Sequence, residues 1–207
     1  MTNPKRREHH EIVYKKENLS KTVLVQCTFK TSPYNKSKIL VYAESLNKTV
    51  SETLSDLLIV CLEKITFTKE WNSNMIELIC NLSENNEELR SRYLNIFHSM
   101  NYADVKQEPY QAQGEEQLAY KDLAQCTFKT SAVAKNLLID LAQSRGETMS
   151  DTLCDLLICE DYGKLMRDDY IGRRMLLTQD IIRKIANGNG RIAKQFIEEY
   201  ESMFNKK

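Results

Sequence analysis

The sequence has no apolar run close to the roughly 20 residues that a membrane-spanning helix needs, although hydrophobic residues make up 42% of it. Residues 1–20 are polar and charged and lack the apolar stretch of a signal peptide. From these two absences we expect a cytoplasmic protein without membrane association. A chain of 207 residues is long enough for one large or two small domains, each with a hydrophobic core.

The sequence also lacks the motifs of common enzyme and cofactor sites. It contains no phosphate-binding loop, no dinucleotide fingerprint and no Ser/His/Asp or Cys/His set that stands out. Its six cysteines form no C-x-x-C pair and lie among apolar neighbours, which is typical of buried cysteines in a reducing compartment. We therefore predict no enzymatic activity, no cofactor, no metal site and no disulfide framework.

The chain has no net charge, since 29 basic residues balance 29 acidic ones. Taken alone, this balance argues against nucleic-acid binding. The charges are unevenly distributed, however. Residues 1–65 carry 11 basic and 7 acidic side chains, whereas residues 66–121 carry 5 and 9. A locally basic surface can bind phosphates even when the total charge cancels.

What the sequence does contain is an internal repeat. The heptapeptide Gln26–Ser32 recurs letter for letter as Gln125–Ser131, at an offset of 99 residues. Extended without gaps to Ile59 and Ile158, the alignment has 18 identical positions out of 34. Only one region of each half repeats, so the chain contains two copies of one unit and is not a solenoid.

Each copy begins with the pattern of a strand followed by a helix. Residues 23–31 and 123–130 alternate between polar and apolar side chains and are rich in Val, Thr and Phe, which predicts strands. Ser32 precedes a proline at the first helical position, and Ser131 occupies the same place in the second copy. Both serines are suited to cap a helix.

A second helix follows in each copy. Asn47 and Gly146, which tolerate the left-handed conformation of a C-cap, are expected to end the first helix. Thr49 and Thr148 then begin capping patterns with an acidic residue in the first turn. The expected apolar sides of the four helices are Ile39, Leu40, Ala43 and Leu46; Leu137, Leu138, Leu141 and Ala142; Val50, Leu54, Leu57, Leu58 and Cys61; and Met149, Leu153, Leu156 and Leu157.

In order, spacing and repetition, residues 22–65 and 121–165 resemble the ribbon-helix-helix family, the Arc/MetJ type of bacterial DNA-binding protein. The resemblance implies a mostly α fold with a small β component, in which two ribbon-helix-helix units pair as an antiparallel two-stranded ribbon and additional helices complete the chain. In that family the ribbon enters the major groove of DNA. Both units lie in one chain here, as in some conjugative-plasmid relaxosome accessory proteins, so we expect the strands to pair within the chain; pairing between two chains is the alternative.

The resemblance assigns roles to individual residues. The outward side chains of the strands would contact DNA bases: Gln26, Thr28, Lys30, Gln125, Thr127 and Lys129. The start of each second helix would contact phosphates: Thr49, Val50, Ser51, Thr148, Met149 and Ser150. Exposed polar residues on a strand are ordinarily just solvated surface, but packing does not explain why three of them are unchanged between the copies. One departure from the family pattern is Thr31 and Thr130, where simple alternation would place another bulky apolar residue.

The rest of the chain is divided around the two units at 21–65 and 121–160. Residues 1–20 are predicted to be a flexible basic arm, residues 66–120 a connector with helices at 71–82 and 84–100, and residues 161–207 a helical extension with a turn at 187–190. Its apolar stripe, which we expect to pack in a core, is Ile192, Phe196, Tyr200 and Met203. Its basic residues, which could flank DNA or form an exposed helix face, are Arg167, Arg173, Arg174, Arg183 and Lys184.

Two functions of different classes follow. The first is sequence-specific binding of double-stranded DNA at a near-palindromic or repeated site, by a transcriptional repressor or an accessory factor in plasmid conjugation or partition. The alternative is a protein-interaction module, such as an antitoxin whose helical tail binds a partner protein. In that case residues 162–204 would form the surface for the partner or for self-association.

Overall fold

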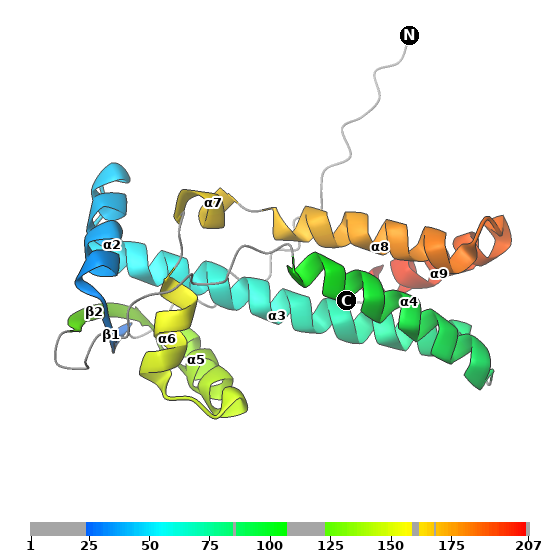
Figure 1. Ribbon diagram of the computed structural model, residues 1–207, viewed down its shortest axis with the longest axis horizontal. Helices are drawn as coiled ribbons and strands as arrows, with labels where there is room; N and C mark the ends of the chain where they lie inside the picture. Colours follow the sequence, from blue (N-terminus) through cyan, green and yellow to red (C-terminus); the bar gives the residue numbers. More distant parts are fainter. Residues whose placement is uncertain (1–23, 85, 107–122, 159–161, 168, 206–207) are drawn as a thin grey trace, which may run out of the picture. The chain divides into compact units, whose positions relative to one another are not determined.

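The computed structural model describes residues 24–84, 86–106, 123–158, 162–167 and 169–205. The protein is mostly helical with one small two-stranded antiparallel sheet, as the sequence predicts (Figure 1). The predicted N-terminal arm and residues 107–120 of the predicted connector lie outside the described residues. The elements are β1 (Leu24–Thr31), α2 (Pro33–Ser45), α3 (Val50–Leu82), α4 (Glu87–Lys106), β2 (Ala124–Ser131), α5 (Ala132–Arg145), α6 (Met149–Leu157), α7 (Tyr162–Arg167), α8 (Tyr170–Ala186) and α9 (Gly190–Asn205).

The chain forms two compact units. One consists of Met1–Glu63 and Glu115–Ile158; its described part contains both strands, α2, α5, α6 and the start of α3, and we call it the ribbon unit. The other consists of Lys64–Gly114 and Cys159–Lys207, and we call it the helical unit. The segments that the sequence suggests as connector and C-terminal extension therefore belong largely to one compact unit.

The two strands of the ribbon unit pair antiparallel within one chain, as expected. Thr28 lies opposite Thr127. These threonines are equivalent in the repeat, so an approximate two-fold axis that relates the copies passes between them. Beneath the ribbon the rings of Phe29 and Phe128 meet edge to face, with centroids 6.4 Å apart.

The predicted helix caps are present in both copies. The hydroxyls of Ser32 and Ser131 each accept a hydrogen bond of 3.1 Å from the amide three residues further on. Asn47 and Gly146 have positive φ angles of 53° and 68°, which reverse the chain after α2 and α5. The short polar side chain of Asn and the missing Cβ of Gly are what make this conformation accessible.

The buried side of α2 is narrower than the sequence predicts. Ile39 and Ala43 are buried, but Leu40 and Leu46 are about 41% and 40% exposed. The expectation that all four line one buried side is therefore wrong for the two leucines. In the second copy Arg145 occupies the position of Leu46, and its charge agrees with the exposure of this position.

The second helix of the first copy does not end near residue 65. It continues without interruption as α3 to Leu82, so the helix predicted from Trp71 is its second half. Residues 50–82 contain neither glycine nor proline, and nothing in the sequence stops the helix. The buried core of the helical unit combines this half with α4, α8 and α9: Trp71, Met75, Leu78, Ile79, Tyr93, Phe97, Ile181, Ile182, Ile185 and Phe196.

The C-terminal stripe packs in this core. Phe196 is buried, and Ile192 and Tyr200 pack against it, whereas the side chain of Met203 lies outside the described residues. The turn before α9 is also confirmed, since Asn187 and Gly188 have φ angles of 46° and 81°. Among the described residues, none of the helices combines the length and the apolar character that crossing a membrane requires.

Candidate nucleic-acid interface

The polar side chains of β1 and β2 form one row on the outer face of the ribbon. Thr28 and Thr127 lie at its centre, with their hydroxyl oxygens 3.2 Å apart and either able to donate. The residues that alternate with these polar side chains are buried on the opposite face of the ribbon: Cys27, Phe29, Cys126 and Phe128. The row, which we call the polar row, contains three exposed or half-buried residues from each copy: Gln26, Thr28, Lys30, Gln125, Thr127 and Lys129.

The two-fold register determines how this row is ordered. Gln26 lies opposite Lys129, and Lys30 lies opposite Gln125. Each end of the row therefore presents one amide and one ammonium group, and the centre presents two hydroxyls. A surface of this kind offers the same chemical groups to both halves of a two-fold symmetric ligand.

Thr31 and Thr130, the departure noted in the sequence, continue the alternation. Both are buried at the end of their strands, on the same face as the cysteines and phenylalanines. The Thr130 hydroxyl accepts a hydrogen bond of 3.1 Å from Ser55 on α3. A small β-branched residue therefore replaces a bulky apolar one where a helix approaches the strand, and the polar row keeps its orientation.

Helices α2 and α5 bond to the edges of the ribbon, each on the strand of the other copy. The Nζ of Lys36 donates to the carbonyl of Gln125 over 3.3 Å, and the Nζ of Lys135 donates to the carbonyl of Gln26 over 3.0 Å. These carbonyls point away from the neighbouring strand, as they do in the non-hydrogen-bonded pairs of an antiparallel ladder. The lysines are equivalent in the repeat, so the two contacts obey the same two-fold axis.

Helices α3 and α6 bond to the backbone of the two lysines of the polar row, again each on the strand of the other copy. The Ser51 hydroxyl accepts a hydrogen bond of 3.0 Å from the amide of Lys129. The Cys154 thiol donates to the carbonyl of Lys30 over 3.1 Å. Helices of each copy thus bond to the strand of the other, and these hydrogen bonds support the backbone of the polar row.

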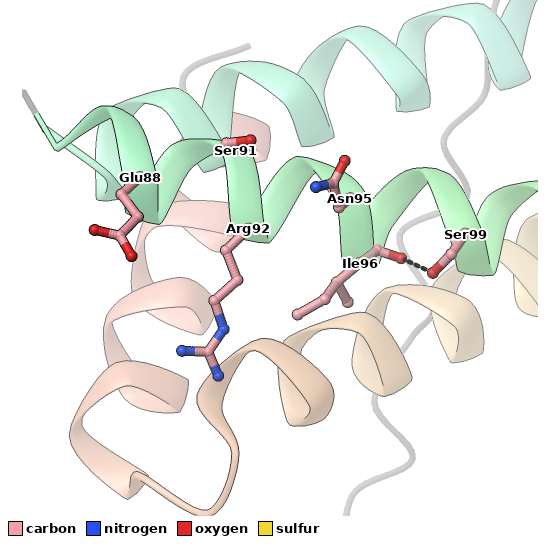
Figure 2. Close-up of a pocket in the computed structure, with 6 residues that line it drawn as sticks. All are labelled: Glu88, Ser91, Arg92, Asn95, Ile96 and Ser99. Atoms are coloured by element: carbon pink, nitrogen blue, oxygen red, sulfur yellow. Dashed lines mark hydrogen bonds between the residues drawn. The ribbon is translucent and has the colours of Figure 1, made fainter.

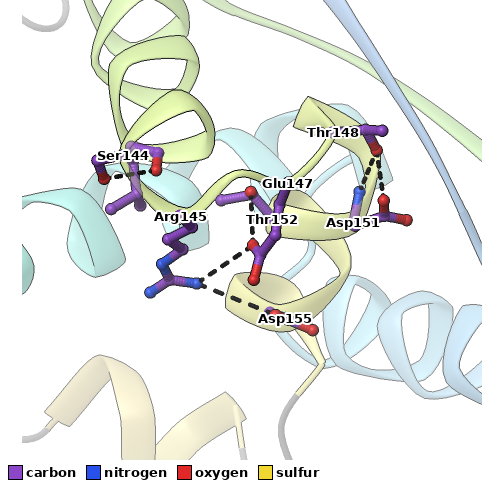
Figure 3. A network of polar contacts seen from close by, with 8 residues as sticks. Ser144, Arg145, Glu147, Thr148, Asp151, Thr152 and Asp155 are labelled. Carbon is purple, nitrogen blue, oxygen red and sulfur yellow. Dashed lines mark hydrogen bonds and ion pairs between the residues drawn. The ribbon is translucent and has the colours of Figure 1, made fainter.

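The starts of α3 and α6 have the predicted capping geometry. The Glu52 carboxylate accepts hydrogen bonds from the Thr49 amide and hydroxyl, over 2.9 and 2.7 Å, and these bonds lower the pKa of Glu52. The Thr148 hydroxyl donates to the Asp151 carboxylate over 2.6 Å (Figure 3). Thr49 and Thr148 are exposed, and the other four predicted phosphate contacts are half-buried: Val50, Ser51, Met149 and Ser150.

The turn that precedes each of these helices carries different charges in the two copies. In the first, Lys48 pairs with Asp56 over 2.7 Å. In the second, Arg145 lies 3.9 Å from both Glu147 and Asp155 (Figure 3). In the first copy the positive charge lies at Lys48, in the turn before α3. In the second copy it lies at Arg145, the last residue of α5. Partial burial and the nearby carboxylate of Glu147 raise the pKa of Asp155, while Arg145 opposes them.

The basic residues of α8 do not form one exposed face. Arg174 is only 4% exposed, and its guanidinium donates to Asn101 over 2.7 Å and lies 4.9 Å from the centre of the Trp71 ring. It belongs to the interior of the helical unit, so our suggestion of an exposed or DNA-flanking Arg174 is wrong. Arg183 and Lys184 are exposed, and Arg183 pairs with Asp180 over 2.9 Å. The side chain of Arg167 lies outside the described residues.

A hollow beside α4 in the helical unit contains none of the predicted site residues (Figure 2). Its one apolar side chain is that of Ile96, and the carbonyl of this residue accepts a hydrogen bond of 2.9 Å from Ser99. The described residues contain no group of three or more His, Cys, Asp or Glu side chains that could hold a metal ion. The hollow is lined by Glu88, Ser91, Arg92, Asn95, Ile96 and Ser99.

Sequence reasoning overlooked the residues that hold the ribbon from its edges. The identity of Lys36 and Lys135 is a signal that could have found them, because their helices share only two other identical positions. Cys154 gave no such signal, because Ser55 occupies its position in the other copy.

Comparison of the chain with protein-family models, curated proteins and solved structures found no match in any of the three.

Proposed function

We propose that this protein binds double-stranded DNA in a sequence-specific manner, with the β1–β2 ribbon in the major groove. The observation that carries the proposal is the polar row, in which three identical residues from each copy lie on the outer face of one ribbon about a two-fold axis. B-DNA has a major groove wide enough for a two-stranded ribbon, and every base pair displays a distinct pattern of donors and acceptors there.

The chemistry of the row supports base recognition. An amide such as that of Gln26 can bond to adenine at two positions, and an ammonium such as that of Lys30 can donate to guanine. The Thr28 hydroxyl can bond to either kind of base, and its methyl can contact thymine. Because the row has two-fold symmetry, its best target is a near-palindrome whose centre lies at the pair formed by Thr28 and Thr127.

The order of the elements also supports DNA binding. A strand and two helices occur twice, as in the ribbon-helix-helix proteins that the sequence resembles, and the starts of α3 and α6 offer exposed Thr49 and Thr148 as contacts for the DNA backbone. Within this proposal the protein acts as a transcriptional repressor or as an accessory factor in plasmid DNA processing. The location of its binding site, beside a promoter or a transfer origin, separates these roles.

Selection of bound duplexes from a random pool tests the proposal. We expect a near-palindromic consensus and much weaker binding to unselected duplexes. Replacing Gln26, Thr28, Gln125 and Thr127 together with Ala should remove most of this discrimination, because each good base contact contributes about 1–3 kcal/mol. Binding to unselected duplexes should persist, because it depends on phosphates.

A matched control for this variant replaces exposed glutamines on helices, Gln143 and Gln195, with Ala. The control should keep the discrimination of the wild type, and circular dichroism should show that both variants retain their helices. A pool that yields no consensus, or a polar-row variant that discriminates as well as the wild type, contradicts the proposal.

A second candidate function, binding of a partner protein by the helical unit, is favoured by apolar side chains on its surface. Met175 and Leu176 on α8 are about 50% and 62% exposed, and Ile197 on α9 is about 47% exposed. The predicted stripe itself packs inward at Phe196, so a partner would have to use the outer side of these helices. Co-purification of the chain from its native cells tests this candidate; a stoichiometric partner that is lost on Leu176→Asp would support it.

A further inference from the structure

Two lysines are unusual in being unchanged between α2 and α5. Residues 33–48 and 132–147 share only three identical positions. Two of them have a clear structural reason: the equivalent alanines Ala43 and Ala142 are buried, and the equivalent serines donate to the backbone of their own helix over 2.7 Å. The third is Lys36 with Lys135, which is neither buried nor part of the apolar side.

The two ammonium groups lie at the two edges of the polar row. Their bonds to the carbonyls of Gln125 and Gln26 place them beside the two ends of the polar row. They also lie close to the two thiols beneath the ribbon. Burial raises the pKa of Cys27, and the charge of Lys135 opposes this shift. Burial raises the pKa of Cys126 as well, and the charge of Lys36 opposes that shift.

An ammonium group has three protons to donate. Each lysine uses one of them for a carbonyl, and the hydrogen bond lies in an exposed region, so the group can donate to another acceptor at the same time. In a ribbon that lies in the major groove, the two edges face the two phosphate backbones that form the walls of the groove. A cation at each edge of the ribbon is therefore in position to contact a phosphate on one of the two DNA strands.

Resting on the proposed function, we propose that Lys36 and Lys135 are a pair of DNA phosphate contacts, one at each edge of the ribbon. Each lysine bonds at once to a DNA phosphate and to the backbone of a glutamine that contacts bases. This double contact fixes the register between the polar row and the DNA backbone. It also explains why the lysine is unchanged in helices that share only two other identical positions.

The salt dependence of DNA binding tests this proposal in the full-length chain. The probe is a fluorescent duplex of random sequence, to which the wild type should bind with an affinity that falls steeply with salt. Each lost phosphate contact reduces the slope of log K against log[salt] by about 0.9. We therefore expect the double variant Lys36→Met with Lys135→Met to have a slope shallower by about 2, and the double Arg variant to keep the slope of the wild type.

Lys38→Met is the matched control. Lys38 lies on the same helix, but its equivalent in the second copy is Leu137 and its Nζ lies over the ring of Tyr34. This variant should leave the slope unchanged. A double Met variant that binds more weakly but with the wild-type slope would show that the lysines only support the ribbon, and would overturn the inference alone. A wild type that binds no duplex at all would overturn the proposed function and this inference together.

Discussion

Equivalent threonines of the two copies differ in their hydrogen bonding. Thr130 accepts a hydrogen bond from Ser55, whereas the buried hydroxyl of Thr31 has no partner within the described part of the chain. The difference follows from one residue, since Cys154 occupies the position of Ser55 and donates its proton to the carbonyl of Lys30. A buried hydroxyl without a partner destabilises the fold, because it loses its bonds to water.

Thr53 and Thr152 differ in the same way. Thr152 donates to the carboxylate of Glu147 over 3.0 Å. In the other copy Lys48 occupies the position of Glu147 and cannot accept a hydrogen bond, and the buried hydroxyl of Thr53 has no partner among the described residues. In both pairs the threonine is unchanged and its partner has changed. Single changes of partner can therefore alter stability without any change at the threonine itself.

We predict that Thr31→Val stabilises the protein and that Thr130→Val destabilises it. Val has the shape of Thr without the hydroxyl, so the first change removes an unpaired group, and the second removes the acceptor of Ser55. We expect shifts of about 1 kcal/mol in opposite directions in the free energy of unfolding. Urea denaturation followed by circular dichroism measures both, and equal shifts in the two variants would contradict the assignment of the hydrogen bonds.

At the scale of elements, the turn between the two helices of each copy shows how a duplicated segment can keep its shape while its charges change. Lys48 and Asp56 form a close pair in the first copy. In the second copy Arg145 is shared between Glu147 and Asp155, and both contacts are longer. The backbone turn is retained because Asn47 and Gly146 both adopt positive φ angles. The geometry of the turn therefore depends on these two residues and not on the ion pairs.

The different ion pairs at the two turns predict opposite effects for equivalent substitutions of Asp155 and Asp56. The pKa of Asp155 is raised above its usual value of 3.8, which means that the folded state favours the protonated carboxyl. Its contribution to stability is present below pH 3.8 and is lost as the pH rises through the higher pKa of the folded state. Asp155→Asn should therefore stabilise the protein at neutral pH, and the gain should disappear in acid.

Asp56→Asn is the matched control, since it removes the pair with Lys48. It should lower the free energy of unfolding by up to about 1 kcal/mol at neutral pH, which is the usual range for an exposed ion pair. Urea denaturation at a series of pH values measures both variants. Loss of stability at neutral pH in Asp155→Asn would mean that its contact with Arg145 outweighs the repulsion from Glu147.

At the scale of the whole molecule, one chain supplies both strands of the ribbon and the helices that hold them. A repeat that forms its own two-fold axis needs no second chain to complete the polar row. The remaining helices form a separate unit whose core contains the only tryptophan of the sequence. The two units therefore have different cores, and the polar row belongs to the ribbon unit alone.

We predict that one chain occupies one DNA site. In a titration of a selected duplex, occupancy should rise with the first power of protein concentration, and the mass of the complex should equal one chain plus one duplex. Proteins that complete a ribbon only as dimers give a steeper curve in the range where the dimer dissociates. Mass photometry combined with fluorescence anisotropy measures both quantities, and a second-power dependence would indicate that two chains are needed.

The sequence by itself determined the local structure and the surface of the ribbon. The alternation of Gln26–Ser32 specified a strand with a polar face, and identity with Gln125–Ser131 specified two equivalent strands. The caps at Ser32 and Ser131 followed from residue types, because such signals depend on neighbours within a few positions. The predicted end of the second helix near residue 65 is wrong, because residues 50–82 contain neither glycine nor proline to end it.

Only the tertiary structure decided which apolar and charged side chains are buried. Leu40 and Ile39 are alike in sequence, yet only Ile39 faces the ribbon unit's core. Arg174 is buried because Trp71 and Asn101, far away in the chain, provide a ring face and an acceptor. The contacts of Lys36 and Lys135 likewise depend on carbonyls of the other copy, 89 and 109 residues away. Contacts of this kind arise from the meeting of distant segments, which a local pattern does not specify.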